Sequence, residues 1–227
     1  MSVAGNITKI KSQLPPHVCL VAVSKTHPPE VIIEAYHAGQ RIFGENRVQE
    51  LIAKYAALPK DIEWHLIGHL QSNKVKQIAS FVKLIHSVDS LKLLQEIDRE
   101  ALKHQRIIDC LLQVHIAEEE SKFGFDADEV ENITKLPEFN KLLNIRIRGL
   151  MGMATLTEDT KTVQAEFHFL ATLFTEIKTR LKAEKENLIP FSSPFDILSM
   201  GMTGDYKIAI EEGSNMIRVG SAIFGNR

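Results

Sequence analysis

The residue best placed for chemistry is Lys25, which ends the apolar run 18–24 and is followed closely by two prolines. An uninterrupted apolar run predicts a strand buried on both faces. Side chains alternate along a strand, so Val21, Val23 and Lys25 are expected on one face. An amine that leaves an apolar wall is poorly solvated, which favours Schiff-base chemistry. The alternative is an ordinary strand-end lysine that reaches water through its long side chain.

Two glycine-containing segments near the C-terminus, 198–205 and 217–225, could bind an anion. Glycine lets the backbone approach an anion closely, and hydroxyl and N–H groups at a helix start donate hydrogen bonds to it. We therefore expect a phosphate site made by Ser199, Thr203, Gly220 and Ser221. The alternative is that these glycines only form tight turns.

Arg218 lies within the apolar run 216–219. Arginine is almost never buried without a partner. It could form a structural ion pair with Asp89 or Glu45, or it could donate to a ligand. A strand-end lysine, a phosphate site and an arginine together would suit a phosphorylated aldehyde.

Metal catalysis fits this sequence poorly. His65 and His69 are four residues apart, without the glutamate of an H-E-x-x-H helix. We expect each to be a packed or capping histidine. The acidic stretch 118–120 is expected to be a solvated loop, so no metal site is predicted.

The bulk composition excludes several classes of protein. The chain has 227 residues and a formal net charge of −2, so no nucleic-acid partner is expected. Two cysteines in apolar runs fit a reducing compartment. The N-terminus lacks the apolar region of a signal peptide, and apolar runs are too short for a membrane span. We expect a cytoplasmic protein.

Apolar, strand-like runs alternate with amphipathic stretches along the whole chain. Strands are expected at 18–24, 41–44, 64–67, 82–88, 108–116, 145–151, 195–200 and 216–223. Helices are expected at 6–13, 28–37, 46–58, 72–80, 90–104, 127–136, 160–185 and 205–212. This alternation predicts one (β/α)₈ TIM-barrel domain over residues 1–227, with an additional N-terminal helix. A doubly wound open sheet is the alternative, but no G-x-G-x-x-G follows the first strand.

Several motifs resemble those of one known family. They are Ala22-Val-Ser-Lys25, Phe43-Gly-Glu-Asn46-Arg-Val-Gln-Glu50, Trp64-His-Leu-Ile-Gly68, Leu70-Gln-Ser-Asn-Lys74, Lys122-Phe-Gly, Gly149-Leu-Met-Gly-Met153, Leu198-Ser-Met-Gly-Met202 and Arg218-Val-Gly-Ser221. In this order they resemble the pyridoxal-phosphate homeostasis proteins, the YggS/PROSC family. That family is similar to the N-terminal barrel of alanine racemase.

The resemblance implies a cofactor and a role for each candidate residue. Pyridoxal 5′-phosphate (PLP) would form a Schiff base with Lys25, and Asn46 would lie near its ring. Arg218 would face the pyridine nitrogen, and the predicted phosphate site would hold the phosphate. The role of Lys122 is left open between a functional and a surface lysine.

The same resemblance argues for binding without turnover. Arginine keeps its proton, so the pyridine nitrogen beside it would stay unprotonated and the electron sink would be weak. Alanine racemase adds a tyrosine base from a second domain, whereas this chain ends soon after the last strand. Its tyrosines, Tyr36, Tyr55 and Tyr206, fall in helical stretches.

We therefore expect a monomeric cofactor carrier or regulator in intracellular PLP homeostasis that supplies apo PLP-dependent enzymes. One alternative is a small PLP-dependent amino-acid racemase whose second base comes from a partner. The other is a Schiff-base aldolase-type barrel acting on a sugar phosphate.

Overall fold

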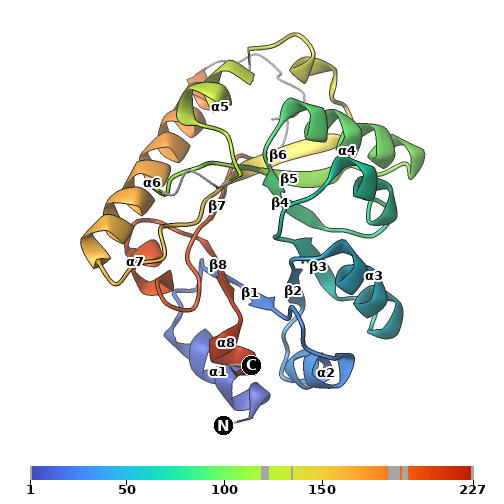
Figure 1. Cartoon of the computed structure of the whole chain (residues 1–227), viewed down its shortest axis with the longest axis vertical. Helices are drawn as coiled ribbons and strands as arrows, with labels where there is room; N and C mark the ends of the chain where they lie inside the picture. The colour runs from blue at the N-terminus through green and yellow to red at the C-terminus, as the bar shows by residue number, and fades with distance from the viewer. Residues whose placement is uncertain (1, 119–122, 134, 184–189, 191–193, 226–227) are drawn as a thin grey trace.

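Eight parallel strands form a closed barrel, in which each strand pairs with the next and β8 pairs with β1 (Figure 1). The computed structural model describes residues 2–118, 123–133, 135–183, 190 and 194–225. The strands are β1 (Cys19–Val23), β2 (Ile42–Glu45), β3 (Glu63–Leu66), β4 (Leu84–Val88), β5 (Ile108–Gln113), β6 (Ile145–Met151), β7 (Ile197–Ser199) and β8 (Met216–Val219). The predicted TIM barrel is confirmed.

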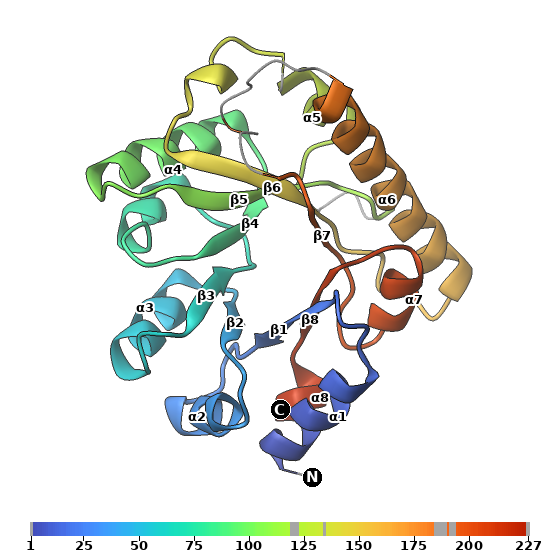
Figure 2. The same cartoon turned by 180° about the vertical axis from the view of Figure 1, so that it is seen from behind.

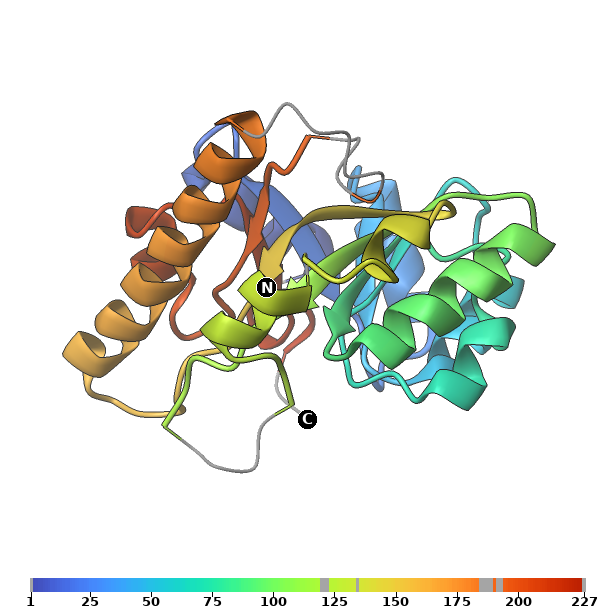
Figure 3. The same cartoon turned by 90° about the horizontal axis from the view of Figure 1, so that it is seen from above.

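Helices surround the barrel, with α4 and the long α6 on opposite sides of it (Figure 3). The α-helices are α1 (Val3–Gln13), α2 (Pro29–His37), α3 (Val48–Ala57), α4 (Leu91–Lys103), α5 (Ala127–Ile133), α6 (Thr160–Ala183), α7 (Tyr206–Glu211) and α8 (Ser221–Phe224). The described ranges also contain the 3₁₀ helices η1 (Ser72–Gln77) and η2 (Phe139–Lys141). Within the described ranges, no helix is both long and apolar enough to span a bilayer.

The expected eighth strand, 216–223, is wrong at its C-terminal end. The strand stops at Val219, and Ser221 begins a one-turn helix. The carbonyl of Gly220 accepts hydrogen bonds from the N–H groups of Ile223 and Phe224. The run stays apolar through both elements, so hydrophobicity alone could not place this boundary. The expected α-helix at 72–80 is instead the 3₁₀ helix η1.

The barrel interior consists of an apolar layer and, next to it, a polar one. The apolar layer contains Val21, Leu84, Leu111, Met151 and Met216. Two residues further along β4 and β8, on the same face, the interior residues are His86 and Arg218. Polar interior side chains therefore lie toward the C-terminal ends of the strands, where sites in this fold occur.

The expected N-terminal helix is present and packs beside the last helix. Ile7 and Ile10 of α1 are buried. Asn6 donates a side-chain hydrogen bond to the carbonyl of Ile223 at 2.9 Å. Figures 1 and 2 both show α1 next to α8. The N-terminal helix therefore supports the segment that follows β8.

Gly149 marks the closest approach of β6 to β7. A Cβ at this position would lie 1.7 Å from the carbonyl oxygen of Ile197. We expect Gly149→Ala to lower the free energy of unfolding by about 3 kcal/mol or more, because the two strands would have to separate. Urea unfolding followed by the fluorescence of Trp64 measures this.

The matched control is Gly213→Ala. Gly213 also has a positive φ, 99°, but a Cβ there meets no atom within 4 Å. Backbone strain alone should then cost about 1 kcal/mol. Equal losses for the two variants would contradict the steric argument.

Candidate functional site

A cavity of about 440 Å³ opens at the C-terminal ends of the strands. Its lining includes the predicted site residues Lys25, Asn46, Thr203, Arg218, Gly220 and Ser221. Its apolar walls come from Val23, Ile67, Met153, Leu156, Val163 and Met202. The structure thus brings together side chains from β1, β8 and the loops after β2 and β7.

Lys25 lies two residues after the end of β1 and lines the cavity together with Val23, while Val21 belongs to the apolar layer below. The side chain is exposed at the cavity. The expectation of a poorly solvated amine is therefore wrong. The apolar strand β1 ends at Val23, so the side chain of Lys25 lies beyond its buried part. The amine is accessible to a small molecule that enters the cavity.

The loops after β7 and β8 meet at the cavity wall. The N–H of Gly220 donates to the hydroxyl Oγ1 of Thr203 at 3.3 Å. Ser221 begins α8, and the first N–H groups of a helix have no partner within that helix. Hydroxyl and N–H donors therefore gather where the sequence predicted an anion site.

Ser199 does not line this cavity. Its side chain is fully buried in the barrel, and its Oγ accepts a hydrogen bond from Arg218 at 2.7 Å. The predicted phosphate ligands are thus divided: Thr203, Gly220 and Ser221 lie at the cavity, and Ser199 lies behind Arg218.

Arg218 is 4% exposed and is held by oxygen atoms of two neighbouring strand ends. Its guanidinium donates to the carbonyl of Ser199 at 2.9 Å and to the carbonyl of Gly152 at 2.9 Å. Burial lowers the pKa of Arg218 to about 10, which the charge of Asp205 partly opposes. Arg218 is therefore still cationic near neutral pH, and it reaches the cavity as a charged donor.

The ion pairs proposed for Arg218 from sequence are wrong. Asp89 lies 3.1 Å from His69 instead. Glu45 lies 2.7 Å from the ammonium of Lys54. Both carboxylates thus have other partners, and the compensation of Arg218 comes from carbonyl and hydroxyl oxygens.

A buried chain of two histidines continues from Ser199. His86 Nδ1 lies 3.1 Å from Ser199 Oγ, and His86 Nε2 lies 3.0 Å from His65 Nδ1. Burial lowers the pKa of His65 to about 3, and burial, His65 and Arg218 lower that of His86. Both rings are therefore neutral near pH 7. The prediction that His65 is packed is confirmed. No sequence motif pointed to His86, although its place two residues after Leu84 indicates the barrel interior.

Asn46 is positioned by the tight approach of the loops after β2 and β3. A Cβ on Gly68 would lie 2.3 Å from the backbone oxygen of Asn46. Only glycine therefore allows this loop to pass so close. The motif that ends in Gly68 has this steric role.

The remaining candidates lie away from the cavity. His69 pairs with Asp89 and stacks on Phe123, with ring centroids 3.9 Å apart. Among described residues, no group of three or more His, Cys, Asp and Glu could hold a metal ion. Lys122 and most of the acidic stretch 118–120 fall outside the described residues.

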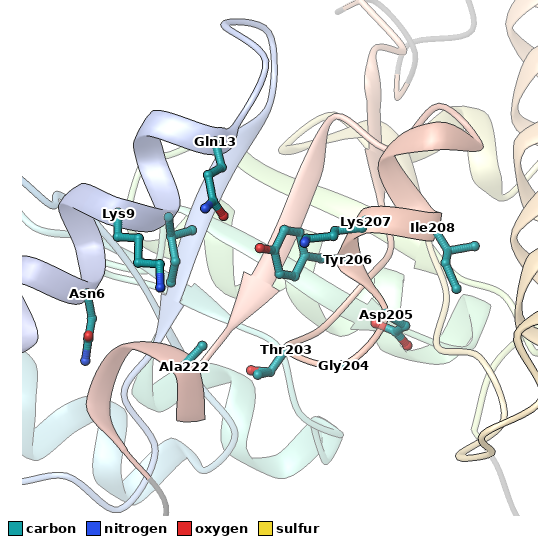
Figure 4. A pocket seen from close by; sticks show the side chains of 11 residues that line it. Asn6, Lys9, Gln13, Thr203, Gly204, Asp205, Tyr206, Lys207, Ile208 and Ala222 are labelled. Atoms are coloured by element: carbon teal, nitrogen blue, oxygen red, sulfur yellow. The ribbon is translucent and has the colours of Figure 1, made fainter. Parts of the chain in front are cut away.

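A second cavity, of about 530 Å³, lies between α1 and α7 and shares the segment 203–205 with the first. Figure 4 shows Lys9 and Gln13 reaching from α1 toward Tyr206 of α7. Neither Lys25 nor Arg218 lines it. Of these two cavities, only the smaller one combines the amine of Lys25, the guanidinium of Arg218 and anion donors.

Fold and site together define a class of protein. The family model of the alanine racemase N-terminal domain matches residues 2–227, and the chain belongs to this family. The alanine racemase of Clostridium difficile 630 has a TM-score of 0.74 at 17% identity, covering 100% of this chain and 56% of that one. At this identity the likeness shows the fold alone.

Relatives that match nearly the whole chain identify a narrower class within this family. The chain is 41% identical to the pyridoxal phosphate homeostasis protein of Aquifex aeolicus (strain VF5), over 92% of this chain and 86% of that one. PipY of Synechococcus elongatus PCC7942, solved with PLP bound, has a TM-score of 0.85 at 40% identity, covering 99% and 100%. Within its family, the chain belongs to the pyridoxal phosphate homeostasis proteins.

The buried histidines make stability depend on pH. An unfolded histidine takes up a proton near pH 6.5, whereas folded His65 does so only near pH 3. Between these values the unfolded chain binds more protons, so stability falls as pH falls. For His65 the loss between pH 8 and pH 5 is about 2 kcal/mol.

We expect His65→Gln to lose about 2 kcal/mol less than the wild type between pH 8 and pH 5. Urea unfolding at both pH values measures the difference. His17→Gln, at an exposed position before β1, is the control and should keep the wild-type pH dependence. A wild-type pH dependence in His65→Gln would show that His65 does not stay neutral in the fold.

Proposed function

We propose that this protein binds pyridoxal 5′-phosphate through Lys25 and acts in intracellular PLP homeostasis as a cofactor carrier or regulator. The observation that carries the proposal is a cavity that combines Lys25, Arg218 and the donors of the β7 and β8 loops. The names of the full-length relatives and the PLP bound to PipY support it.

The cavity fits the three functional groups of PLP. Its volume, about 440 Å³, is in the range of sites for small molecules. The exposed amine of Lys25 suits an aldehyde. Thr203, Gly220 and Ser221 offer hydroxyl and N–H donors to a phosphate. The charged guanidinium of Arg218 is a donor and suits a ring nitrogen that accepts a hydrogen bond.

Lys25 is proposed as the covalent anchor. With PLP present, the Nζ of Lys25 would bond to the aldehyde carbon, and the aldehyde oxygen would leave as water with both amine protons. When bound, PLP can supply an electron sink for amino-acid chemistry. The other residues of the cavity hold the molecule in place while the bond lasts.

Ser199 has a different part in this proposal from the one expected from sequence. Its carbonyl and hydroxyl both accept from Arg218, at 2.9 and 2.7 Å. It therefore orients the guanidinium, while the phosphate is left to Thr203, Gly220 and Ser221. Asn46, which also lines the cavity, is kept near the ring in this proposal.

Carriage rather than turnover is proposed for two reasons. Arg218 stays protonated and so does not protonate a ring nitrogen, which keeps the electron sink weak. None of the three tyrosines lines the cavity: Tyr36 bonds Asp61, Tyr55 stacks on Phe81, and Tyr206 faces the second cavity. A monomeric, cytoplasmic carrier of this kind would deliver PLP to apo PLP-dependent enzymes.

Reduction with borohydride tests the anchor. We expect the PLP-loaded protein to yield one pyridoxyl adduct on the peptide that contains Lys25, as identified by mass mapping. Lys25→Ala should lose the adduct, and Lys9→Ala, in the second cavity, should keep it. An adduct on another lysine, or inhibition of a sugar-phosphate reaction by PLP, would favour the aldolase-type alternative.

Replacement of Arg218 tests the weak electron sink. We expect Arg218→Glu to raise the exchange of the α-proton of alanine in D₂O by about tenfold or more, because a carboxyl group can protonate the ring nitrogen. Proton NMR measures the exchange, and absorbance measures bound cofactor. Arg218→Gln, which has no carboxyl group to donate a proton, is the control. Unchanged exchange with cofactor bound would mean that the ring nitrogen does not limit turnover.

A further inference from the structure

The backbone on both sides of Lys25 is held by side chains of β2 and α3. Before Lys25, the carbonyl of Ser24 accepts a hydrogen bond from the ammonium of Lys54 at 2.8 Å. After it, the N–H of Thr26 donates to the carboxylate of Glu50 at 2.6 Å. The hydroxyl of Ser24 donates to Glu45 at 2.5 Å. The segment that presents Lys25 is therefore tied at each end.

These contacts hold a turn that is unfavourable by itself. The N–H of His27 donates to the carbonyl of Ser24 at 3.1 Å, which closes a four-residue turn with Lys25 second. Thr26, in the third place, has a φ of 66°. A turn with positive φ in this place normally takes glycine, and a β-branched residue is strained there. Such a conformation persists only where its surroundings impose it.

The imposing group is a buried ion pair. Lys54 and Glu45 are 5% and 0% exposed, and their charged atoms lie 2.7 Å apart. The second carboxylate oxygen of Glu45, Oε2, is buried without a hydrogen-bond partner in the described part of the chain. A buried pair that leaves an oxygen unsatisfied adds little stability and is often replaceable by neutral residues. Its contacts with Ser24, the first residue of this turn, offer a reason for its presence.

We propose that Lys54, together with Glu45 and Glu50, is a positioning group that holds the turn so that the amine of Lys25 is directed into the cavity. None of the three side chains lines the cavity, so they act through Lys25. The inference rests on the proposed function, in which Lys25 bonds to the aldehyde of PLP. A misdirected amine would bond more slowly, since small displacements of a reacting group cost large factors in rate.

The test is the double variant Lys54→Met with Glu45→Gln, which removes both buried charges and keeps an acceptor for Ser24. After PLP is mixed with apo protein, absorbance should show the Lys25 bond forming about tenfold to a hundredfold more slowly. Its Tm should stay within about 4 °C of the wild type. The control, Lys103→Met with Glu100→Gln, removes a pair on α4 with atoms 2.6 Å apart and should keep the wild-type rate.

Thr26→Gly provides the rescue. Glycine adopts a positive φ without strain, so adding Thr26→Gly to the double variant should restore most of the rate. A purely structural role for Lys54 would show no such recovery. An unchanged rate in the double variant, or no recovery with glycine, would overturn the inference.

The wild type in the same experiment separates the two proposals. If the wild type yields no borohydride adduct on Lys25, the proposed function is contradicted. If the wild type yields the adduct and the double variant forms the Lys25 bond at the wild-type rate, only the positioning role of Lys54 is contradicted.

Discussion

The solvation of one buried charge organises the interior of this barrel. The guanidinium of Arg218 is almost fully buried, so its charge must be compensated largely by oxygen atoms of the protein. Those atoms are the carbonyls of Ser199 and Gly152 and the hydroxyl of Ser199. They come from the ends of β7 and β6, the two strands that precede β8 in the barrel. The same charge helps to keep His86 neutral.

The site lies where the first strand meets the last. Val21 of β1 is in register with Arg218 of β8, and Ala22 with Val219. Lys25 and the loop of Gly220 therefore leave the barrel side by side, although nearly 200 residues separate them in the chain. Arg218 belongs to β8, whereas Lys25 lies in the turn that follows β1. Buried side chains of β2 and α3 hold that turn.

A barrel of this family does not by itself specify an activity. The fold is shared with alanine racemase, so what distinguishes this chain must be sought in its side chains. A cationic arginine in the cavity disfavours protonation of a bound ring nitrogen, and the tyrosines all point elsewhere. The amine of Lys25 is accessible from the cavity. These features support the proposal of a carrier over that of an enzyme.

The sequence by itself determined the alternation of strands and helices, the shared face of Val21, Val23 and Lys25, and the anion donors after the last two strands. These features depend on local periodicity and on residue type, which a single chain displays directly. Which side chains meet across the barrel depends on closure and register, which no local pattern contains. Only the tertiary structure therefore placed Ser199 behind Arg218, joined His86 to it, and set Lys54 against the turn that carries Lys25.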